Sequence, residues 1–285
     1  MRGLAGHLGC GLGLVCAVLE RPRSWVYYRR RVTKGRKLRR PELEGPVREI
    51  LRSRPATYGY RRVHAMLLEK GIVCNPKTVW AVLRRNGWLS TAREKTRRPG
   101  RSHDGQVAVL EPNRRWASDF TWIQAWNGEK GRLAVIIDCA DRMILAWRFQ
   151  PHLNTEHICE MVREAIFRRF GEDRRQAQGI EFLTDNGTEF KTKFQGFLNS
   201  MGLVPCHTPC RSPESNGVVE AFFGTLKRDY VYQSCLETRA EVQRQIPGWL
   251  TDYNEVGPHS SLGMRSPMRF YQEWKAKNGL NAVQN

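Results

Sequence analysis

Three acidic residues in the sequence have surroundings that favour a metal-dependent active site. Asp119 lies inside a β-prone segment, where an isolated charge is costly unless it is paired or bound to a metal ion. Asp185 follows a short apolar run and precedes Asn-Gly, so we predict it at the end of a strand beside a turn. Glu220 lies near the start of a helical run, 221–232, and off the face on which its apolar residues recur. Two strands and one helix are thus predicted to supply three carboxylates.

Such a set of carboxylates suits a hard divalent cation, which prefers oxygen ligands from separate rigid elements. Two such ions can activate an attacking hydroxyl and stabilise the leaving oxygen in a displacement at phosphorus. We therefore expect two ions, Mg²⁺ or Mn²⁺, held by Asp119, Asp185 and Glu220, and a phosphoryl-transfer reaction. Asp138 is the strongest rival of Asp119 as a ligand, but with Asp141 it brackets a strand end, where we expect the pair to hold a turn.

Four segments of the chain resemble the motifs of one family, in that family's order: 116–122, 183–190, 207–220 and 253–267. They are similar to the integrase-core transposases of bacterial insertion sequences and, more narrowly, to the OrfB product of insertion sequence family three. The similarity covers about residues 40–275. It implies an RNase H-like fold and a catalytic triad that falls on Asp119, Asp185 and Glu220, and it favours Asp119 over Asp138.

The segment between Asp185 and Glu220 holds 34 residues, one fewer than is usual in the family that the chain resembles. Its last part is rich in Ser, Pro, Asn and Gly, so we expect a loop that absorbs the difference. Lys227 lies two helical turns after Glu220 on the same face, and relatives resemble it in carrying a basic residue there, so we expect it to contact the DNA end. The same helical pattern leaves Asp229, less cleanly, off the apolar face. The residues expected to shape the pocket and the loop are Asn186, Gly187, Ser212, Pro213, Asn216 and Gly217.

The charge of the chain is concentrated in its first third. The net charge is +19; residues 1–100 hold 24 Lys and Arg against 6 Asp and Glu, and residues 101–285 hold 23 against 22. An excess of 18 positive charges in one region predicts a polyanionic partner, most simply the phosphate backbone of DNA. The balanced remainder is typical of a folded catalytic domain.

Residues 41–92 are predicted to form a helix-turn-helix-like DNA-binding domain. A helix over 59–68, a turn at 70–74 and a helix over 75–85 that begins with a cap and a proline have the spacing of this motif. A helical hairpin need not bind DNA, and the charge of this region is what favours the DNA-binding alternative. The expected contacts, chiefly to phosphates, are Arg61, Arg62, Lys77, Arg84 and Arg85.

The remaining domain boundaries follow from composition and pattern. Residues 1–40 are a basic region for which two descriptions stay open, a short helical pair over 5–32 or a tail that orders only on DNA. A basic linker is expected over 93–111, the catalytic core over 112–235, and a helical extension of the core over 236–285.

Within the core, strands are predicted first and then strands alternating with helices. The expected strands are 114–123, 132–138, 143–149, a strand that ends at Asp185, and 203–207; the expected helices are 155–170, 190–201, 221–232 and 236–253. This order predicts an α/β fold, and the resemblance implies its form: an RNase H-like integrase core with a mixed five-stranded sheet and flanking helices, preceded by the small all-α region. The aromatic segment after Pro267 is expected to pack as a C-terminal subdomain or to contact DNA.

The cysteines and the N-terminal residues favour a protein that stays inside the cell. Eight cysteines are scattered without a Cys-x-x-Cys pair; Cys206, His207 and Cys210 could be half a zinc site, but no second half is visible, and reduced thiols are the favoured alternative. The apolar start resembles a signal peptide, yet its core is rich in glycine and contains His7, which argues against export. No run is long enough to span a bilayer. We expect a cytoplasmic, nucleoid-associated bacterial protein.

Taken together, these features predict a DNA transposase that cleaves the ends of its insertion sequence and joins the 3′-hydroxyl to a target. Its expected partners are double-stranded DNA, as terminal repeats and as target, further copies of the chain bound on DNA, and an upstream-frame product as fusion or partner. Two alternatives remain: a DNA-binding regulator with an inactive core, and an RNase H-like nuclease that does not join.

Overall fold

The computed structural model of the chain describes residues 9, 12–18, 40–53, 57–89, 109–184, 192–207 and 217–282. The chain divides into two compact units, 1–41 and 42–285. The smaller unit contains helix α2 (Leu12–Val18), which falls within the predicted N-terminal helical pair, whereas the second predicted helix of that pair lies outside the described residues. The larger unit carries the sheet and all helices from α4 onward.

The sheet has five strands in the order β3-β2-β1-β4-β5. The first three strands, β1 (Arg115–Gln124), β2 (Lys130–Asp138) and β3 (Ile144–Gln150), form an antiparallel meander, and β4 (Glu181–Thr184) and β5 (Val204–His207) add parallel strands beyond β1. This mixed five-stranded sheet confirms the fold class predicted from the sequence.

Local chemistry explains how these strands pair. The hairpin between β1 and β2 turns at Asn127-Gly128, where Gly128 has a φ of 89° that only glycine adopts without strain. The parallel register of β1 and β4 sets Ala117 opposite Leu183, and Arg115 donates to the neighbouring Glu181 at 2.6 Å. Because β1 and β4 run in the same direction, their carboxyl ends reach the same edge of the sheet.

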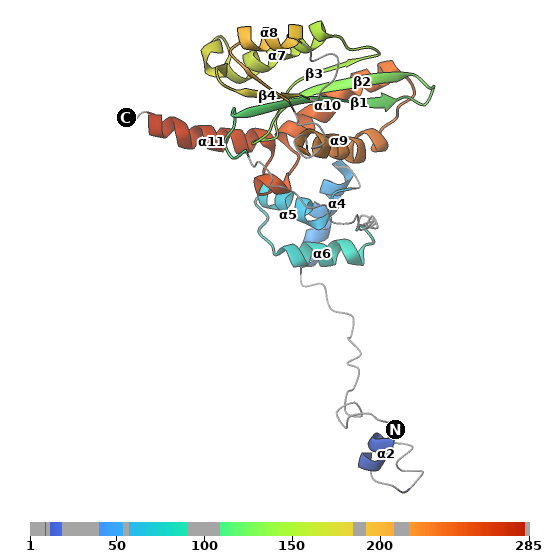
Figure 1. The fold of residues 1–285 in the computed structure, drawn as a ribbon. Helices are drawn as coiled ribbons and strands as arrows, with labels where there is room; N and C mark the ends of the chain where they lie inside the picture. Colours follow the sequence, from blue (N-terminus) through green and yellow to red (C-terminus); the bar gives the residue numbers. More distant parts are fainter. Residues whose placement is uncertain are drawn as a thin grey trace. The chain divides into compact units, whose positions relative to one another are not determined.

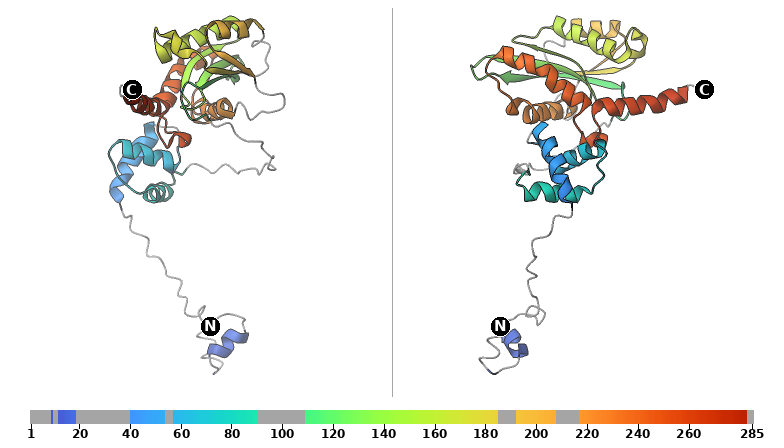
Figure 2. Two further views of the ribbon diagram at one scale, coloured as in Figure 1. Left: turned by 60° about the vertical axis from the view of Figure 1, so that its left-hand side comes forward. Right: turned by 180° about the vertical axis from the view of Figure 1, so that it is seen from behind.

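Two layers of helices cover the two faces of the sheet (Figures 1 and 2). On one face, α7 (Thr155–Phe170) and α8 (Thr192–Ser200) pack on side chains such as Trp116 and Phe182. On the other face, α9 (Gly217–Asp229) and α10 (Arg239–Glu255) pack on Ala117, Val135, Ile137 and Leu183. Alternate residues of each strand thus point to different helical layers, as the period of a strand requires.

Helix α10, predicted as an extension beyond the core, contributes to the core itself. Val242, Ile246 and Leu250 belong to the same buried cluster as β2 and α9. Buried Asn254, near its end, makes a pair of hydrogen bonds with the backbone of Ile144: its amide donates to the carbonyl and its oxygen accepts from the N–H, each at 2.9 Å. These bonds fix the end of α10 to the edge strand β3.

Helix α11 (Pro267–Ala282) follows α10 and lies within the helical extension predicted over 236–285, although no separate helix was predicted after residue 253. It begins at a proline, which is favourable in the first turn, and its Tyr271 and Trp274 rings stack with centroids 6.1 Å apart. The shorter 3-10 turns of the larger unit and its border are η1 (Pro41–Leu43), η2 (Arg174–Ala177), η5 (Val231–Gln233) and η6 (Ser260–Leu262).

The region before the sheet is a three-helix unit. Its helices are α4 (Glu44–Ser53), α5 (Tyr60–Glu69) and α6 (Pro76–Arg85), and their shared core contains Val47, Val63, Val79 and Leu83. Asn75 caps α6 by accepting the backbone N–H of Lys77 at 2.8 Å, as its position before Pro76 predicted. Helix, turn and helix therefore occur where the sequence placed them.

Two further observations concern the apolar helices and the cysteines. Among the described helices, none is long and apolar enough to cross a membrane. Six cysteines within the described residues, Cys16, Cys74, Cys139, Cys159, Cys206 and Cys235, are free thiols.

Candidate active site and nucleic-acid interface

Asp119 lies on the central strand, on the face that α9 covers. Residues 117, 119 and 123 share one face of β1, and both Ala117 and Ile123 belong to the core cluster that includes α9. The neighbour of Asp119 on β2 is Val135, which is fully buried. The Asp119 side chain is half-buried, and its Oδ1 accepts the backbone N–H of Phe120 at 2.8 Å. The carboxylate of Asp119 is thus surrounded by largely apolar neighbours on this face of the sheet.

Glu220 reaches the same side of the sheet from α9. It stands in the first turn of that helix, where the helix dipole favours a negative charge. Val219, Phe222 and Leu226 bury the apolar side of α9 against the sheet, while the Glu220 side chain is exposed. Within the described residues it makes no hydrogen bond or ion pair. Asp119 and Glu220 therefore come from the strand and the helix predicted for them, and both belong to the layer on one face of the sheet.

Most of the remaining predicted pocket residues lie outside the described part of the chain: Asp185, Asn186, Gly187, Ser212, Pro213 and Asn216. Strand β4 ends at Thr184, one residue before Asp185 in the sequence. Gly217 is described; it is exposed and is the first residue of α9. Their roles as metal ligand and loop residues stay predictions, as does the contact of half-buried Lys227 with DNA.

Asp138 and Asp141, the rival acids, hold a turn. Both are fully buried, and both accept from Nη2 of Arg169, at 3.2 Å and 2.7 Å. Asp138 also accepts the backbone N–H groups of Asn113 at 2.7 Å and Ala140 at 2.8 Å. Burial, and then the nearby charge of Asp138, raise the pKa of Asp141 to about 7. Enclosed by protein donors, this pair is structural, as the sequence predicted.

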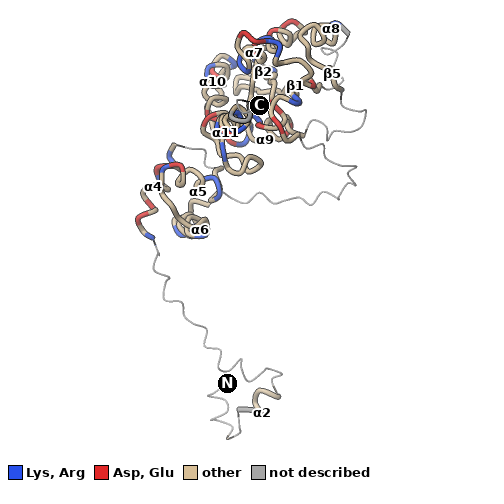
Figure 3. The backbone as a smooth tube through the Cα atoms, turned by 90° about the vertical axis from the view of Figure 1, so that its left-hand side faces the viewer, with Lys and Arg blue, Asp and Glu red and all other residues tan. Residues whose placement is uncertain are grey.

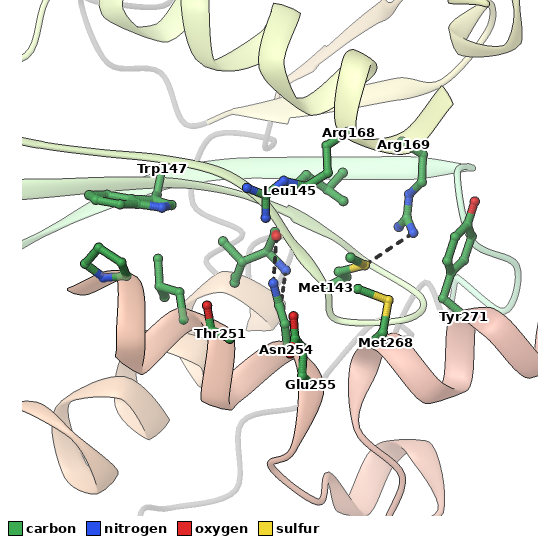
Figure 4. Close-up of a pocket in the computed structure, with 13 residues that line it drawn as sticks. Met143, Leu145, Trp147, Arg168, Arg169, Thr251, Asn254, Glu255, Met268 and Tyr271 are labelled. Carbon is green, nitrogen blue, oxygen red and sulfur yellow. Dashed lines mark hydrogen bonds between the residues drawn. The ribbon is translucent and has the colours of Figure 1, made fainter. Parts of the chain in front are cut away.

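Arg169, which the sequence analysis did not single out, closes this network. It lies at the end of α7, and its guanidinium also sits 3.9 Å from the centroid of the Tyr271 ring on α11. It borders a cavity of about 430 Å³ between β3, α10 and α11, shown in Figure 4 with Met143, Asn254 and Met268. Of the described acids in the predicted triad, neither Asp119 nor Glu220 lines this cavity.

His157, in the first turn of α7, belongs to a capping box. The side chain of Asn154 accepts its backbone N–H at 3.0 Å, and its Nδ1 faces the backbone N–H of Asn154 at 3.3 Å. Cys206, one of the three residues that could form half a zinc site, is half-buried on β5. No cluster of three His, Cys, Asp or Glu side chains able to hold a metal occurs among the described residues.

Helix α6 presents a mixed cationic and aromatic face. Lys77, Arg84 and Arg85 are exposed, and Figure 3 marks the cations of α5 and α6 in blue. Trp80 lies between them, 38% exposed, with the Arg84 guanidinium 5.1 Å from its ring centroid. The indole of Trp80 thus adds an apolar surface with one polar N–H group to the cations of this face. The sequence analysis missed Trp80, although its spacing of three from Lys77 and four from Arg84 places it on their face.

The two predicted cations of α5 differ. Arg61 is exposed and donates to the Tyr60 hydroxyl at 3.2 Å. Arg62 donates through Nη1 to the Asp229 carboxylate at 2.6 Å and lies 5.0 Å from the Tyr58 ring centroid. Arg62 thus has an acidic partner within the chain, at the end of α9, and its contact with DNA stays a prediction.

Comparison with known proteins identifies related domains and chains. The Integrase core domain family matches residues 110–213, a second Integrase core domain family matches 201–267, and an HTH-like domain family matches 37–96. An insertion element IS136 protein of Agrobacterium fabrum is 44% identical over 176 residues, which cover 61% of this chain and 90% of that protein. The transposase InsD of insertion element IS2 from Escherichia coli is 38% identical over 232 residues, covering 79% of this chain and 76% of InsD.

Solved structures resemble the chain at lower identity. A chain of the simian T-cell lymphotropic virus intasome in complex with PP2A regulatory subunit B56 gamma has a TM-score of 0.48 and 17% identity, covering 79% of this chain and 73% of that one. The HTLV-2 integrase catalytic core domain in complex with magnesium has a TM-score of 0.44 and 18% identity, covering 57% of this chain and 97% of that one.

Proposed function

Because the chain belongs to the OrfB-type transposases of insertion sequence family three, we propose that it cleaves the ends of its insertion sequence and transfers the exposed 3′-hydroxyl into target DNA. The observation that carries this proposal is the placement of two acids on one side of the sheet. Half-buried Asp119 on β1 lies on the face covered by α9, and exposed Glu220 stands in the first turn of that helix.

Asp185 completes the proposed site. Ala117 pairs with Leu183 in the parallel register of β1 and β4. In the sequence, Asp119 follows Ala117 by two positions and Asp185 follows Leu183 by two, and side chains two apart on a strand share a face. Continuation of the register by these two steps would bring the second acid beside the first, on the side that α9 covers.

The residue types fit a hard divalent cation, because all three donors are carboxylates and one of them is exposed to solvent. Asp119, Asp185 and Glu220 would hold two Mg²⁺ or Mn²⁺ ions. Such ions, when bound, supply activation of a hydroxyl and stabilisation of charge on a leaving oxygen. The chain's own contribution is position: β1 fixes Asp119 among buried neighbours, and the N-terminus of α9 favours the ionised form of Glu220.

The proposed DNA interface includes α6. Lys77, Arg84 and Arg85 offer phosphate contacts, and Trp80 among them offers an apolar surface of the kind that meets thymine methyl groups in a major groove. Arg61 and Lys227 would add contacts from α5 and α9. We also propose that copies of the chain assemble on the DNA and that an upstream-frame product serves as fusion or partner.

The test is an assay of cleavage and joining. Purified protein is incubated with Mg²⁺ or Mn²⁺ and labelled DNA that carries the ends of its own element, beside Asp185→Asn and Glu220→Gln. Glu156→Gln is the matched control, because Glu156 is also an exposed acid in the first turn of a helix, α7, but on the other face of the sheet.

Nicked and joined products from the wild type and from Glu156→Gln, and none from the other two variants, would support the proposal. Nicked products without joining would favour the nuclease. Binding of the ends without cleavage, with or without the upstream-frame product, would favour the regulator with an inactive core.

A further inference from the structure

Asp229, the last residue of α9, occupies a position that is unfavourable for an acid. Its side chain is 2% exposed, and removal of a carboxylate from water is costly unless donors replace the water. It also lies at the C-terminus of its helix, where the helix dipole disfavours a negative charge. A carboxylate retained under these conditions must be held by strong compensating contacts.

Three residues supply those contacts. Thr57 Oγ1 donates to Oδ1 at 2.5 Å and Arg62 Nη1 donates to Oδ2 at 2.6 Å. Arg228 donates to both oxygens, from Nε at 2.6 Å and from Nη2 at 2.7 Å. Burial acts to raise the pKa of Asp229, but the hydrogen bonds from Arg228, Thr57 and Arg62 outweigh it and hold the pKa below its ordinary value.

Two of these donors come from the helix-turn-helix-like region. Arg62 lies on α5, Thr57 precedes it, and buried Tyr58 between them packs its ring under the Arg62 guanidinium. Asp229 and Arg62 are 167 residues apart in the sequence. The contact therefore joins the DNA-reading part of the chain to the helix that carries Glu220; we name Thr57, Tyr58, Arg62, Arg228 and Asp229 the α9 junction.

Helix α9 connects Asp229 rigidly to Glu220. Asp229 lies nine positions after Glu220, about 13.5 Å along a helix. Between them Phe222, Phe223 and Leu226 are buried, and the Phe222 ring meets the Tyr253 ring edge-on with centroids 4.9 Å apart. A helix packed in this way moves as one body, so a displacement at the junction displaces Glu220 as well.

We propose that the α9 junction is a positioning contact that fixes the catalytic Glu220 relative to the DNA-reading helices, so that the active site meets the phosphodiester at the end of the element. This inference rests on the proposed function. Asp229 acts through Glu220 and the helices of the DNA-binding region, and does not touch the reacting atoms.

A second contact between the same two regions offers a matched control. Arg269 on α11 lies 3.2 Å from Glu69 on α5, but their side chains are 52% and 34% exposed. An ion pair so open to solvent contributes little. Arg269→Gln therefore removes a contact between the same regions without disturbing the buried one.

The first test compares Asp229→Asn, Thr57→Val and Arg269→Gln with the wild type in Mn²⁺. It measures binding to DNA with the element's ends, the rate and position of cleavage there, and nicking of DNA without those ends. We expect Asp229→Asn to keep binding and general nicking within about twofold, to lose at least about tenfold in cleavage at the end, and to spread the remaining cuts over neighbouring phosphodiesters. Thr57→Val should show a weaker form of the same pattern, and Arg269→Gln should match the wild type.

Equal losses of general nicking and end cleavage would reduce Asp229 to a structural residue and overturn the proposal, as would unchanged cleavage at the end. A second readout needs no catalysis: hydrogen exchange at 217–223 with and without end DNA. Binding should slow exchange there in the wild type and in Arg269→Gln but not in Asp229→Asn. A wild type that does not cut yet shows this pattern would count against the proposed function and for the junction; no slowing in any protein would overturn the junction.

Discussion

The two ends of α9 carry the same chemical group in opposite surroundings. Glu220 in the first turn is exposed and makes no hydrogen bond or ion pair within the described part of the chain, whereas Asp229 at the last position is 2% exposed and accepts from Thr57, Arg62 and Arg228. Protein donors saturate the second acid and leave the first to bind something else. The proposed catalytic acid and the proposed positioning acid are therefore distinguished by their hydrogen-bond donors and not by their chemical type.

The substitution that tests this difference between the two acids most strongly is Glu220→Gln. We expect it to lower cleavage and joining by a factor on the order of 10³ or more, because one carboxylate of the proposed site loses its charge. The free energy of unfolding should stay within about 0.5 kcal/mol of the wild type, because the side chain is exposed. Gel analysis of products and urea denaturation measure the two effects; a large loss of stability would show that Glu220 has a structural role.

Substitution of Asp229, at the other end of α9, should instead lower the stability of the protein. Asp229→Ala leaves Arg62 and Arg228 without their acidic partner, and we expect the free energy of unfolding to fall by about 2–3 kcal/mol. The loss should lie below that of a fully buried pair, because the Arg228 side chain is 45% exposed and can return to water. Glu49→Ala, which breaks an exposed pair with Lys70, is the control and should cost about 0.5 kcal/mol or less. Equal costs for the two variants would contradict this account of the junction.

The sequence could predict those elements whose signals are local. The bounds of α7 agree with the expected 155–170 because Asn154 caps its start and Gly171, with a φ of 62°, ends it. The meander and the two helices of the helix-turn-helix-like region follow in the same way from alternation, turns and caps, whereas the mixed five-stranded sheet was implied by the resemblance to a known family. Asp119 and Glu220 lie on the strand and helix expected for them.

What the sequence could not predict depends on contacts between distant residues. The helical pattern left Asp229 off the apolar face of α9, and nothing near it indicates that Arg62, 167 residues earlier, would bury it. Arg169 likewise reads as one cation in a basic helix end, although it closes the network of Asp138 and Asp141. The bounds of helix α11, within the predicted helical extension, were not predicted because its exposed surface and few buried residues give its sequence no clear helical stripe.

A further effect is expected from helix α6, which we propose contacts DNA. Trp80→Ala should weaken binding of the element's ends by about 1–3 kcal/mol, because the indole is the apolar group among the cations of α6. Tyr232→Ala removes an aromatic ring that is 69% exposed outside this region and should leave binding unchanged. Fluorescence anisotropy with labelled ends measures both, and equal affinities for Trp80→Ala and the wild type would remove Trp80 from the interface.

The last expected effect is a pH dependence of stability near the junction. Burial, assisted by the charge of Arg62, lowers the pKa of His259 to about 4 from its ordinary 6.5. The neutral imidazole is therefore favoured in the folded state, so its contribution to stability is complete above about pH 6.5 and is lost as the pH falls toward 4. His259→Gln should flatten the urea-denaturation midpoint over this range. An equally steep profile in the variant would assign the pH dependence to other groups.

The measurement that tests the central claim most directly is metal-directed cleavage of the polypeptide, with Fe²⁺ in place of Mg²⁺ and ascorbate present. The acids of β1, of the edge after β4 and of α9 should form one metal site, so the account predicts cuts near residues 119, 185 and 220 that all disappear in Glu220→Gln and persist in Glu156→Gln. Cuts near Asp138 and Asp141, or cuts that Glu220→Gln does not affect, would contradict it.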